Sequence, residues 1–170
     1  MLSVAALVVA SSMVVGQTSI PDEARKSLGY YVGEWKGEWK QGEKKGTTEL
    51  SIKWVPGKHC TINHYVVKGP EGEFHGCVIS GWDPDKKQVV DTGYESNGST
   101  FEDRWTIKSD ALEEGGSKNT VPQEGVTKGQ CRIEKIGPDE FTYTKTNIDS
   151  DGKKTIAFTG RYRRQSGAAK

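Results

Sequence analysis

Hydrophobic and polar residues alternate strictly from Val32 to Lys40, where the sequence reads VGEWKGEWK. The odd positions place Trp35, Gly37 and Trp39 on one face, and the even positions carry only Glu and Lys. A repeat of two residues is typical of a β-strand with one buried and one wet face. Two indoles with a glycine between them suit the closed end of a small barrel, where a neighbouring backbone comes close.

Further strand-like segments follow at short intervals, separated by turns rich in Gly, Pro, Asn and Asp. They cover residues 50–54, 60–67, 74–82, 89–94, 101–107, 126–136, 141–148 and 155–162, with a further one near 119–121. This number of sequential hairpins predicts an all-β, up-and-down antiparallel barrel of about nine or ten strands, with a two-sheet sandwich as the alternative. The non-periodic region 109–125 is interpreted as a long loop rather than a flap over an open mouth.

A short helix is expected before the first strand. Ser19 is a candidate cap, Pro21 stands near the first turn, and two acidic residues follow it. We expect this helix to run to about Leu28, to end at Gly29 and to plug one end of the barrel.

The dipeptide Asn97-Gly98 predicts a two-residue hairpin turn, which sets a register for the two strands beside it. A carboxylate then falls on the apolar face, which is costly unless the carboxylate is hydrogen-bonded, so Asp103 becomes a candidate functional residue. The apolar face holds the pairs Tyr94–Phe101, Thr92–Asp103 and Val90–Trp105, and the other face holds Asp91 opposite Arg104.

The hairpin over residues 58–82 leaves two choices of inward face. If Lys68 faces Glu73 and Trp82 faces Lys87, the inward set is Cys60, Ile62, His64, Val66, His75, Cys77 and Ile79. A one-residue bulge at either turn instead brings in Tyr65, Val67, Phe74, Val78 and Trp82.

Cys60, His64, His75 and Cys77 have the residue types of a zinc site. In this register, however, the two cysteines lie about four residues apart along the strands, or about 13 Å, which is too far for one metal or for a disulfide. A three-ligand site without Cys60 stays open, but we predict no metal and no cofactor. Neither a nucleophile elbow nor a glycine-rich phosphate loop is present in the sequence.

The 170 residues carry 24 basic and 23 acidic side chains, scattered along the chain. Such a balance excludes a nucleic-acid footprint, and we interpret Arg161, Arg163 and Arg164 as a solvated terminal strand. The three cysteines leave at least one thiol free.

Residues 1–16 are apolar and end in small residues, which predicts a cleaved secretory signal and a single domain over 17–170. The first basic residue is Arg25, so the usual positive start of such a signal is missing. The apolar run is too short for a membrane span. We therefore expect a secreted or periplasmic protein.

Three motifs in order resemble one family. Gly33-x-Trp35 behind a short helix resembles the opening of lipocalins and the wider calycin barrels. Together with Trp54-x-Pro56-Gly57 and Gly81-Trp82-Asp83-Pro84, it is similar to a family of secreted bacterial lipocalin-like proteins of unknown function, over roughly residues 28–163.

The resemblance implies a barrel with an internal cavity, in a superfamily that often carries small apolar molecules. It also implies a basic residue of the last strand over the first tryptophan, for which Arg161 or Arg163 is placed. The Arg-x-Tyr pair of fatty-acid-binding relatives is absent. The late histidine of nitrobindin-type haem barrels is absent too, since the histidines are His59, His64 and His75.

The leading hypothesis is a barrel that binds a small apolar or amphipathic ligand inside. An enzyme with Asp103 as base and His64 as partner is the second hypothesis, and an envelope interaction module with a filled barrel is the third. The candidate ligand-binding residues are Trp35, Trp39, Trp54, His64, Thr92, Tyr94, Phe101, Asp103 and Trp105.

Overall fold

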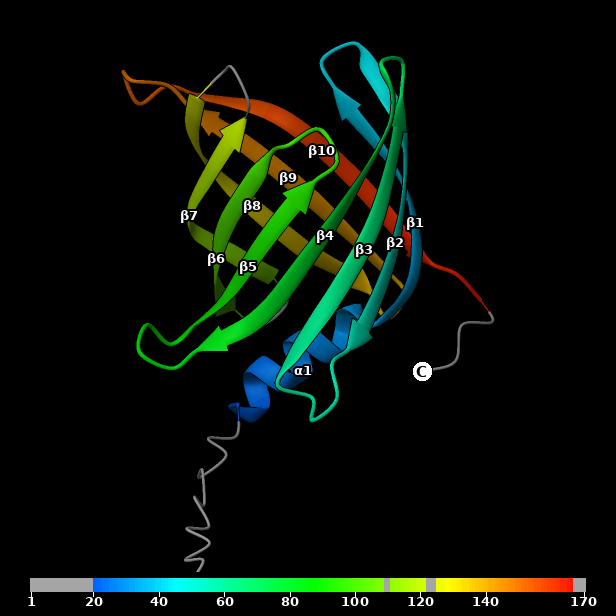
Figure 1. The fold of residues 1–170 in the computed structure, drawn as a ribbon, viewed down its shortest axis with the longest axis vertical. Coiled ribbons are helices and arrows are strands. Elements are labelled where there is room, and N and C mark those ends of the chain that lie inside the picture. Colours follow the sequence, from blue (N-terminus) through cyan, green and yellow to red (C-terminus); the bar gives the residue numbers. More distant parts are fainter. Residues whose placement is uncertain (1–19, 109–110, 122–124, 167–170) are drawn as a thin grey trace, which may run out of the picture.

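In the computed structural model, which describes residues 20–108, 111–121 and 125–166, ten antiparallel strands form a closed barrel behind one helix, α1 (Asp22–Tyr31) (Figure 1). The predicted up-and-down barrel with a short N-terminal helix is therefore confirmed. The strands are β1 (Gly33–Gln41), β2 (Lys44–Trp54), β3 (Cys60–Gly69), β4 (Gly72–Asp83), β5 (Gln88–Glu95), β6 (Thr100–Lys108), β7 (Ala111–Val121), β8 (Gly125–Gly137), β9 (Glu140–Ile148) and β10 (Lys154–Arg164).

Every strand pairs with its neighbours in sequence, and β1 pairs with β10 to close the sheet. Closure leaves no unpaired sheet edge. Figure 1 shows α1 across one end of the barrel, while the turns that join β1 to β2, β3 to β4 and β5 to β6 lie at the other end. We call these the helix end and the turn end. In the described part of the chain, no helix is long and apolar enough to cross a membrane.

The inward face of β1 is as predicted. Trp35 and Trp39 are buried, with 1% and 7% of their surface exposed, and the Glu and Lys residues between them lie on the other face. Gly37 is needed because a Cβ there would lie 2.4 Å from the Tyr162 ring of β10. Only Trp35 lies at the helix end, however. Trp39 lies toward the turn end, where its indole N–H donates to the carbonyl of Lys68 at 3.2 Å.

The helix differs from its predicted bounds. It begins at Asp22 after Pro21, which provides no side-chain cap, and it continues through Gly29 to Tyr31. Gly29 does not end the helix, because Tyr31, two residues further on, is buried in the hydrophobic core. The predicted signal peptide, residues 1–16, lies outside the described residues.

The predicted register of β5 and β6 is wrong by one residue. Glu95, rather than Ser96, stands opposite Ser99, and its carbonyl accepts from the Gly98 N–H at 2.9 Å. Gly98 has φ 86°, so the loop holds three residues and ends in a left-handed glycine. The extra residue turns Thr92 and Tyr94 outward and brings Asp91 to the inner face, opposite Asp103.

The β3–β4 hairpin has the predicted register. Of the two alternatives for its inward face, the structure shows the second, which contains Tyr65. Lys68 pairs with Glu73 and His64 with Cys77, as expected. The connection to β5 has four residues, so Trp82 pairs with Val89 rather than Lys87. The inner face carries Tyr65, Val67, Phe74 and Val78, whereas the set with His64 and the candidate zinc ligands lies on the outer face.

The interpretation of 109–125 as a long loop is wrong, because β7 occupies 111–121. Ser117 and Asn119 are buried on this strand, with 5% and 9% of their surface exposed. Polar residues therefore point into the barrel, and the hydrophobic alternation that marks a strand disappears.

Candidate ligand cavity

The barrel encloses a cavity of about 500 Å³. All ten strands and α1 contribute to a lining that mixes aromatic, aliphatic and polar side chains. This size lies in the range of about 300–1,000 Å³ that is typical of small-molecule sites.

Aromatic packing closes the helix end. The Trp35 ring meets the Phe141 ring edge to face at 4.8 Å, and Tyr31 of α1 meets Phe141 at 5.3 Å. Phe141 stacks on Tyr162 at 4.8 Å. Edge-to-face and offset rings at these distances are favourable beyond their buried area. The helix is thus held as a plug under the cavity.

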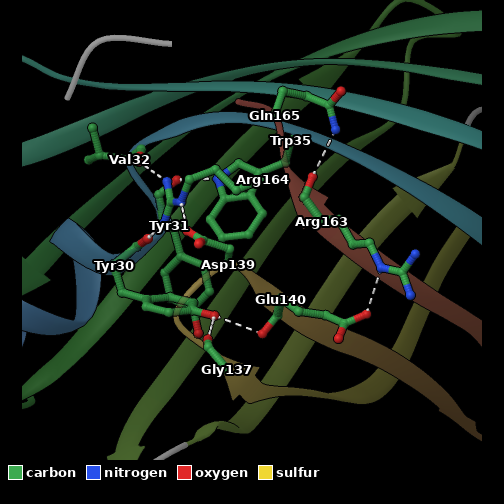
Figure 2. Close-up of polar contacts among 10 residues, drawn as sticks. All are labelled: Tyr30, Tyr31, Val32, Trp35, Gly137, Asp139, Glu140, Arg163, Arg164 and Gln165. Atoms are coloured by element: carbon green, nitrogen blue, oxygen red, sulfur yellow. Dashed lines mark hydrogen bonds and ion pairs between the residues drawn. The ribbon is translucent and has the colours of Figure 1, made fainter. Parts of the chain in front are cut away.

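A guanidinium fixes this plug to the last strand (Figure 2). Arg164 lies over the Trp35 ring at 4.0 Å and donates to the carbonyls of Tyr30 and Val32 at 2.7 and 2.6 Å. Its Nε also donates to Asp139 at 2.8 Å. The carbonyls at a helix C-terminus have no partner within the helix, so Arg164 caps α1.

The Gly33-x-Trp35 motif fits this arrangement. A Cβ on Gly33 would lie 2.6 Å from Nη1 of Arg164, and Gly33 has φ 132°. The expectation that Arg161 or Arg163 would cover Trp35 is wrong by one position, because Tyr162 and Arg164 face inward, whereas Arg161 and Arg163 face outward. Arg161 and Arg163 instead bind Glu140 on the outer face, which lowers the pKa of Glu140 to about 2.

A belt of polar side chains crosses the middle of the cavity wall on six consecutive strands. Each of these residues is the cross-strand partner of the belt residue on the next strand, or lies close to that partner. The polar belt consists of Ser80, Asp91, Asp103, Ser117, Cys131 and Tyr143, on β4 to β9 in order.

Two carboxylates stand side by side in the polar belt, since Asp91 and Asp103 are direct cross-strand partners. Trp105 donates its indole N–H to Asp91 at 2.8 Å, and the Ser80 hydroxyl also hydrogen-bonds to Asp91. Burial nevertheless raises the pKa of Asp91 to about 7, with a smaller contribution from the charge of Asp103. Asp91 therefore holds a proton over part of the neutral range.

Asp103 is 6% exposed and accepts a hydrogen bond from the Ser117 hydroxyl at 2.5 Å. Burial raises its pKa, against the lowering effects of Ser117 and of the Lys145 ammonium. The Cys131 thiol lies 4.0 Å from its other oxygen and 3.0 Å from the Tyr143 hydroxyl. Side chains of β7 and β8 therefore contact both carboxyl oxygens of Asp103.

Further polar groups line the cavity above and below the polar belt. Tyr65 donates its hydroxyl to Glu95 at 2.7 Å toward the turn end, and burial raises the pKa of Tyr65. At the helix end, the buried Tyr31 hydroxyl has no hydrogen-bond partner among the described residues, and neither has the Asn63 Oδ1. Buried polar atoms are normally paired, so these two atoms offer contacts to a molecule in the cavity.

The structure brings three of the nine candidate residues to the cavity wall: Phe101, Asp103 and Trp105. The other tryptophans close its ends, since Trp35 packs under α1, Trp54 lies 3.6 Å from where a Cβ of Gly29 would be, and Trp39 stacks on Phe158 at 5.8 Å. Their role in binding stays a prediction.

The remaining three candidates do not face the cavity. Tyr94 is 65% exposed, and Thr92 and His64 are exposed as well. The one-residue error in the β5–β6 register explains Thr92 and Tyr94, and the outer face of β3 explains His64. The proposed catalytic pair of Asp103 and His64 is therefore split between the two faces of the sheet.

Sequence reasoning missed several polar residues of the wall, among them Asp91, Tyr143 and Lys145. A signal for Asp91 existed, because it follows the apolar Val89 by two residues and so shares its face. Nothing comparable marks Lys145, which stands in the polar run Thr-Lys-Thr-Asn.

The fold and its cavity define a closed, up-and-down β-barrel with an internal cavity. Residues 20–164 match the family described as protein of unknown function (DUF1579), and the chain belongs to that family. No curated protein matches significantly.

Two solved structures show the same fold. The crystal structure of Rv2717c from M. tuberculosis has a TM-score of 0.61 and 13% identity, over 86% of this chain and 99% of the other. The S-type phycobiliprotein lyase CPES from Guillardia theta has a TM-score of 0.53 and 12% identity, over 86% of this chain and 97% of the other.

Proposed function

We propose that this protein binds a small, partly apolar ligand inside its barrel. The observation that carries the proposal is a cavity of about 500 Å³ whose wall combines aromatic rings with a polar belt. A barrel with a purely structural interior would gain stability by filling this space with aliphatic side chains. Unpaired polar atoms of Tyr31 and Asn63 at the cavity wall also favour an occupant.

Binding rather than catalysis fits the arrangement of the wall. The polar belt holds its acids through side-chain donors on neighbouring strands, which gives a rigid site. No histidine lies at the cavity wall among the described residues. The phycobiliprotein lyase has a barrel of similar fold, and by its name that protein acts on another molecule. This similarity is compatible with an interior that binds a ligand here.

Native mass spectrometry of the protein purified from its own host tests this function. We expect a stoichiometric small molecule that leaves on denaturation, in repeated preparations. A bare mass in every preparation, together with no binding of any added aromatic probe, would overturn the proposal in favour of a barrel that acts through its surface.

The same spectrum tests export. We propose that residues 1–16 are removed during secretion, so the intact mass should correspond to a chain that begins at residue 17. A mass that includes residues 1–16 would contradict this proposal.

A further inference from the structure

The charge on the cavity wall is unbalanced. Among the described lining residues, Asp91, Asp103 and Glu95 are acidic, and Lys145 is the one basic residue. Glu95 lies toward the turn end beside Tyr65, so the acidic charge in the middle of the cavity wall is that of the two paired aspartates. A cavity of this kind repels anionic ligands and attracts cationic ones.

The hydrogen bonds of the acidic pair come from the barrel wall. Asp91 accepts from Ser80 and Trp105, and Asp103 accepts from Ser117. A cationic ligand favours the ionised form of both carboxyl groups, which then offer about eight acceptor positions. Ser80, Trp105, Ser117 and the more distant Cys131 thiol supply four donors, so about half of these positions stay free. Buried acceptors without donors are unfavourable, and a ligand that brings N–H groups would remove this cost.

Aromatic side chains flank the pair along the barrel axis. Phe101 precedes Asp103 by two residues on the same inward face, and Trp105 follows it by two. Phe101 lies over Gly93 of the facing strand, where a Cβ would come within 2.1 Å of the ring. Rings on both sides of a carboxylate pair suit a flat molecule that carries a positive charge.

We propose that Asp91 and Asp103 together recognise a protonated amine or amidine on a flat aromatic or otherwise apolar ligand. The inference rests on the proposed function and names the chemical class of its ligand. The N–H groups of the ligand bridge the two carboxylates, and its apolar body packs against Phe101 and Trp105. The Lys145 ammonium, whose charge acts on Asp103 from within the cavity wall, disfavours a second positive charge.

Three probes with one ring system test the inference: 9-(aminomethyl)anthracene, 9-anthracenemethanol and anthracene-9-carboxylate, which are cationic, neutral and anionic at neutral pH. Binding is measured on the wild-type protein by isothermal titration and by quenching of tryptophan fluorescence. We expect the amine to bind about tenfold or more tightly than the alcohol, as one charge-assisted hydrogen bond allows, and the carboxylate to bind least. Equal affinity for all three would overturn the charge inference and leave interior binding intact, whereas no binding of any would count against the proposed function itself.

Asp103→Asn keeps the shape of the acidic pair and removes one charge, and Glu102→Gln removes the same charge from the outer face of the same strand. We expect Asp103→Asn to weaken the amine about tenfold and to leave the alcohol within about threefold, while Glu102→Gln changes neither. If the two variants lost the same affinity for the amine, or if Asp103→Asn lost the same affinity for the amine and the alcohol, direct recognition of the amine by Asp91 and Asp103 would be contradicted. If Asp103→Asn does not fold, Asp91→Asn serves the same comparison.

Discussion

Asp91 shows how one residue couples the cavity to stability. Its carboxyl group is surrounded by the inner wall of the barrel, and the groups that face it are Asp103, Ser80, Trp105 and the Tyr31 hydroxyl. Burial raises the pKa of Asp91 from 3.8 to about 7, so the folded protein keeps a proton that the unfolded chain releases at lower pH. A group that binds protons more tightly in the folded state makes the free energy of unfolding fall as the pH rises.

We therefore predict that the contribution of Asp91 to stability is lost between about pH 4 and pH 7. Asp91→Asn removes the ionisation while its side-chain oxygen still accepts from Trp105. The variant should gain up to about 4 kcal/mol in free energy of unfolding at pH 8 relative to wild type and almost nothing at pH 4, since one pKa unit corresponds to about 1.4 kcal/mol. Urea denaturation across this pH range measures the difference.

Glu102→Gln is the control for this titration, because it removes a carboxylate from the outer face of the neighbouring strand. Its stability difference from wild type should stay within about 0.5 kcal/mol at every pH. If Asp91→Asn followed the same pH profile as Glu102→Gln, the carboxyl group of Asp91 would not be ionising inside the barrel as described.

At the residue scale, sequence reasoning found one acid of the pair and placed the other on the wrong face. Asp103 could be predicted because Phe101 and Trp105 mark its strand face as apolar. Asp91 was placed on the wrong face, because the loop that contains Asn97-Gly98 holds three residues instead of two. Hairpin loops of two and of three residues are both common, and one residue decides the orientation of a whole strand.

Among the elements, the contact between α1 and β10 decides how the helix end is closed. Arg164 is 15% exposed and binds two carbonyls at the C-terminus of α1, Asp139 and the Trp35 ring at once. The side chain of Arg163 next to it is 73% exposed and, among the described residues, binds only Glu140, while the carbonyl of Arg163 accepts from the Gln165 side chain. The two neighbouring arginines therefore form a matched pair of one structural and one surface side chain.

We predict that Arg164→Met lowers the free energy of unfolding by about 2–4 kcal/mol, because it leaves buried helix carbonyls without a donor. Arg163→Met should cost about 0.5 kcal/mol or less, since exposed ion pairs contribute little. Hydrogen exchange should also show faster exchange of the α1 amides in Arg164→Met alone. Equal losses in the two variants would contradict the role of Arg164 as the cap of the helix.

The strands that sequence reasoning predicted differ from those that it missed in the polarity of their inward faces. The strand over Trp35 and Trp39 was predictable because, from Gly33 to Lys40, its inward residues are tryptophan or glycine and its outward ones are all charged. β7 was not, because Ser117 and Asn119 point inward to the polar part of the cavity. On β3 both faces are mixed, with Ile62 and Val66 outside and Asn63 and Tyr65 inside, so hydrophobicity alone does not choose between them.

Seen as a whole molecule, the barrel divides into a packed end and an open interior. The core of α1, Trp35 and Phe141 fills the helix end, and the polar belt with its acidic pair lies between this core and the turn end. A closed sheet keeps its shape without a filled centre, because each strand is hydrogen-bonded on both sides. Stability is thus carried by the helix end, and the binding that we propose belongs to the open interior of the same barrel.

Methyl-resolved NMR with one of the anthracene probes tests interior binding most directly, because the strands carry methyl groups on both faces. Ile52, Val67, Val78 and Val89 point into the cavity, whereas Ile62, Val66 and Ile79 lie on the outer face. We predict saturable shifts and probe contacts for the inward methyl groups and none for the outward ones. Shifts confined to the outward methyl groups would place the ligand on the surface and contradict the proposal that this barrel binds its ligand inside.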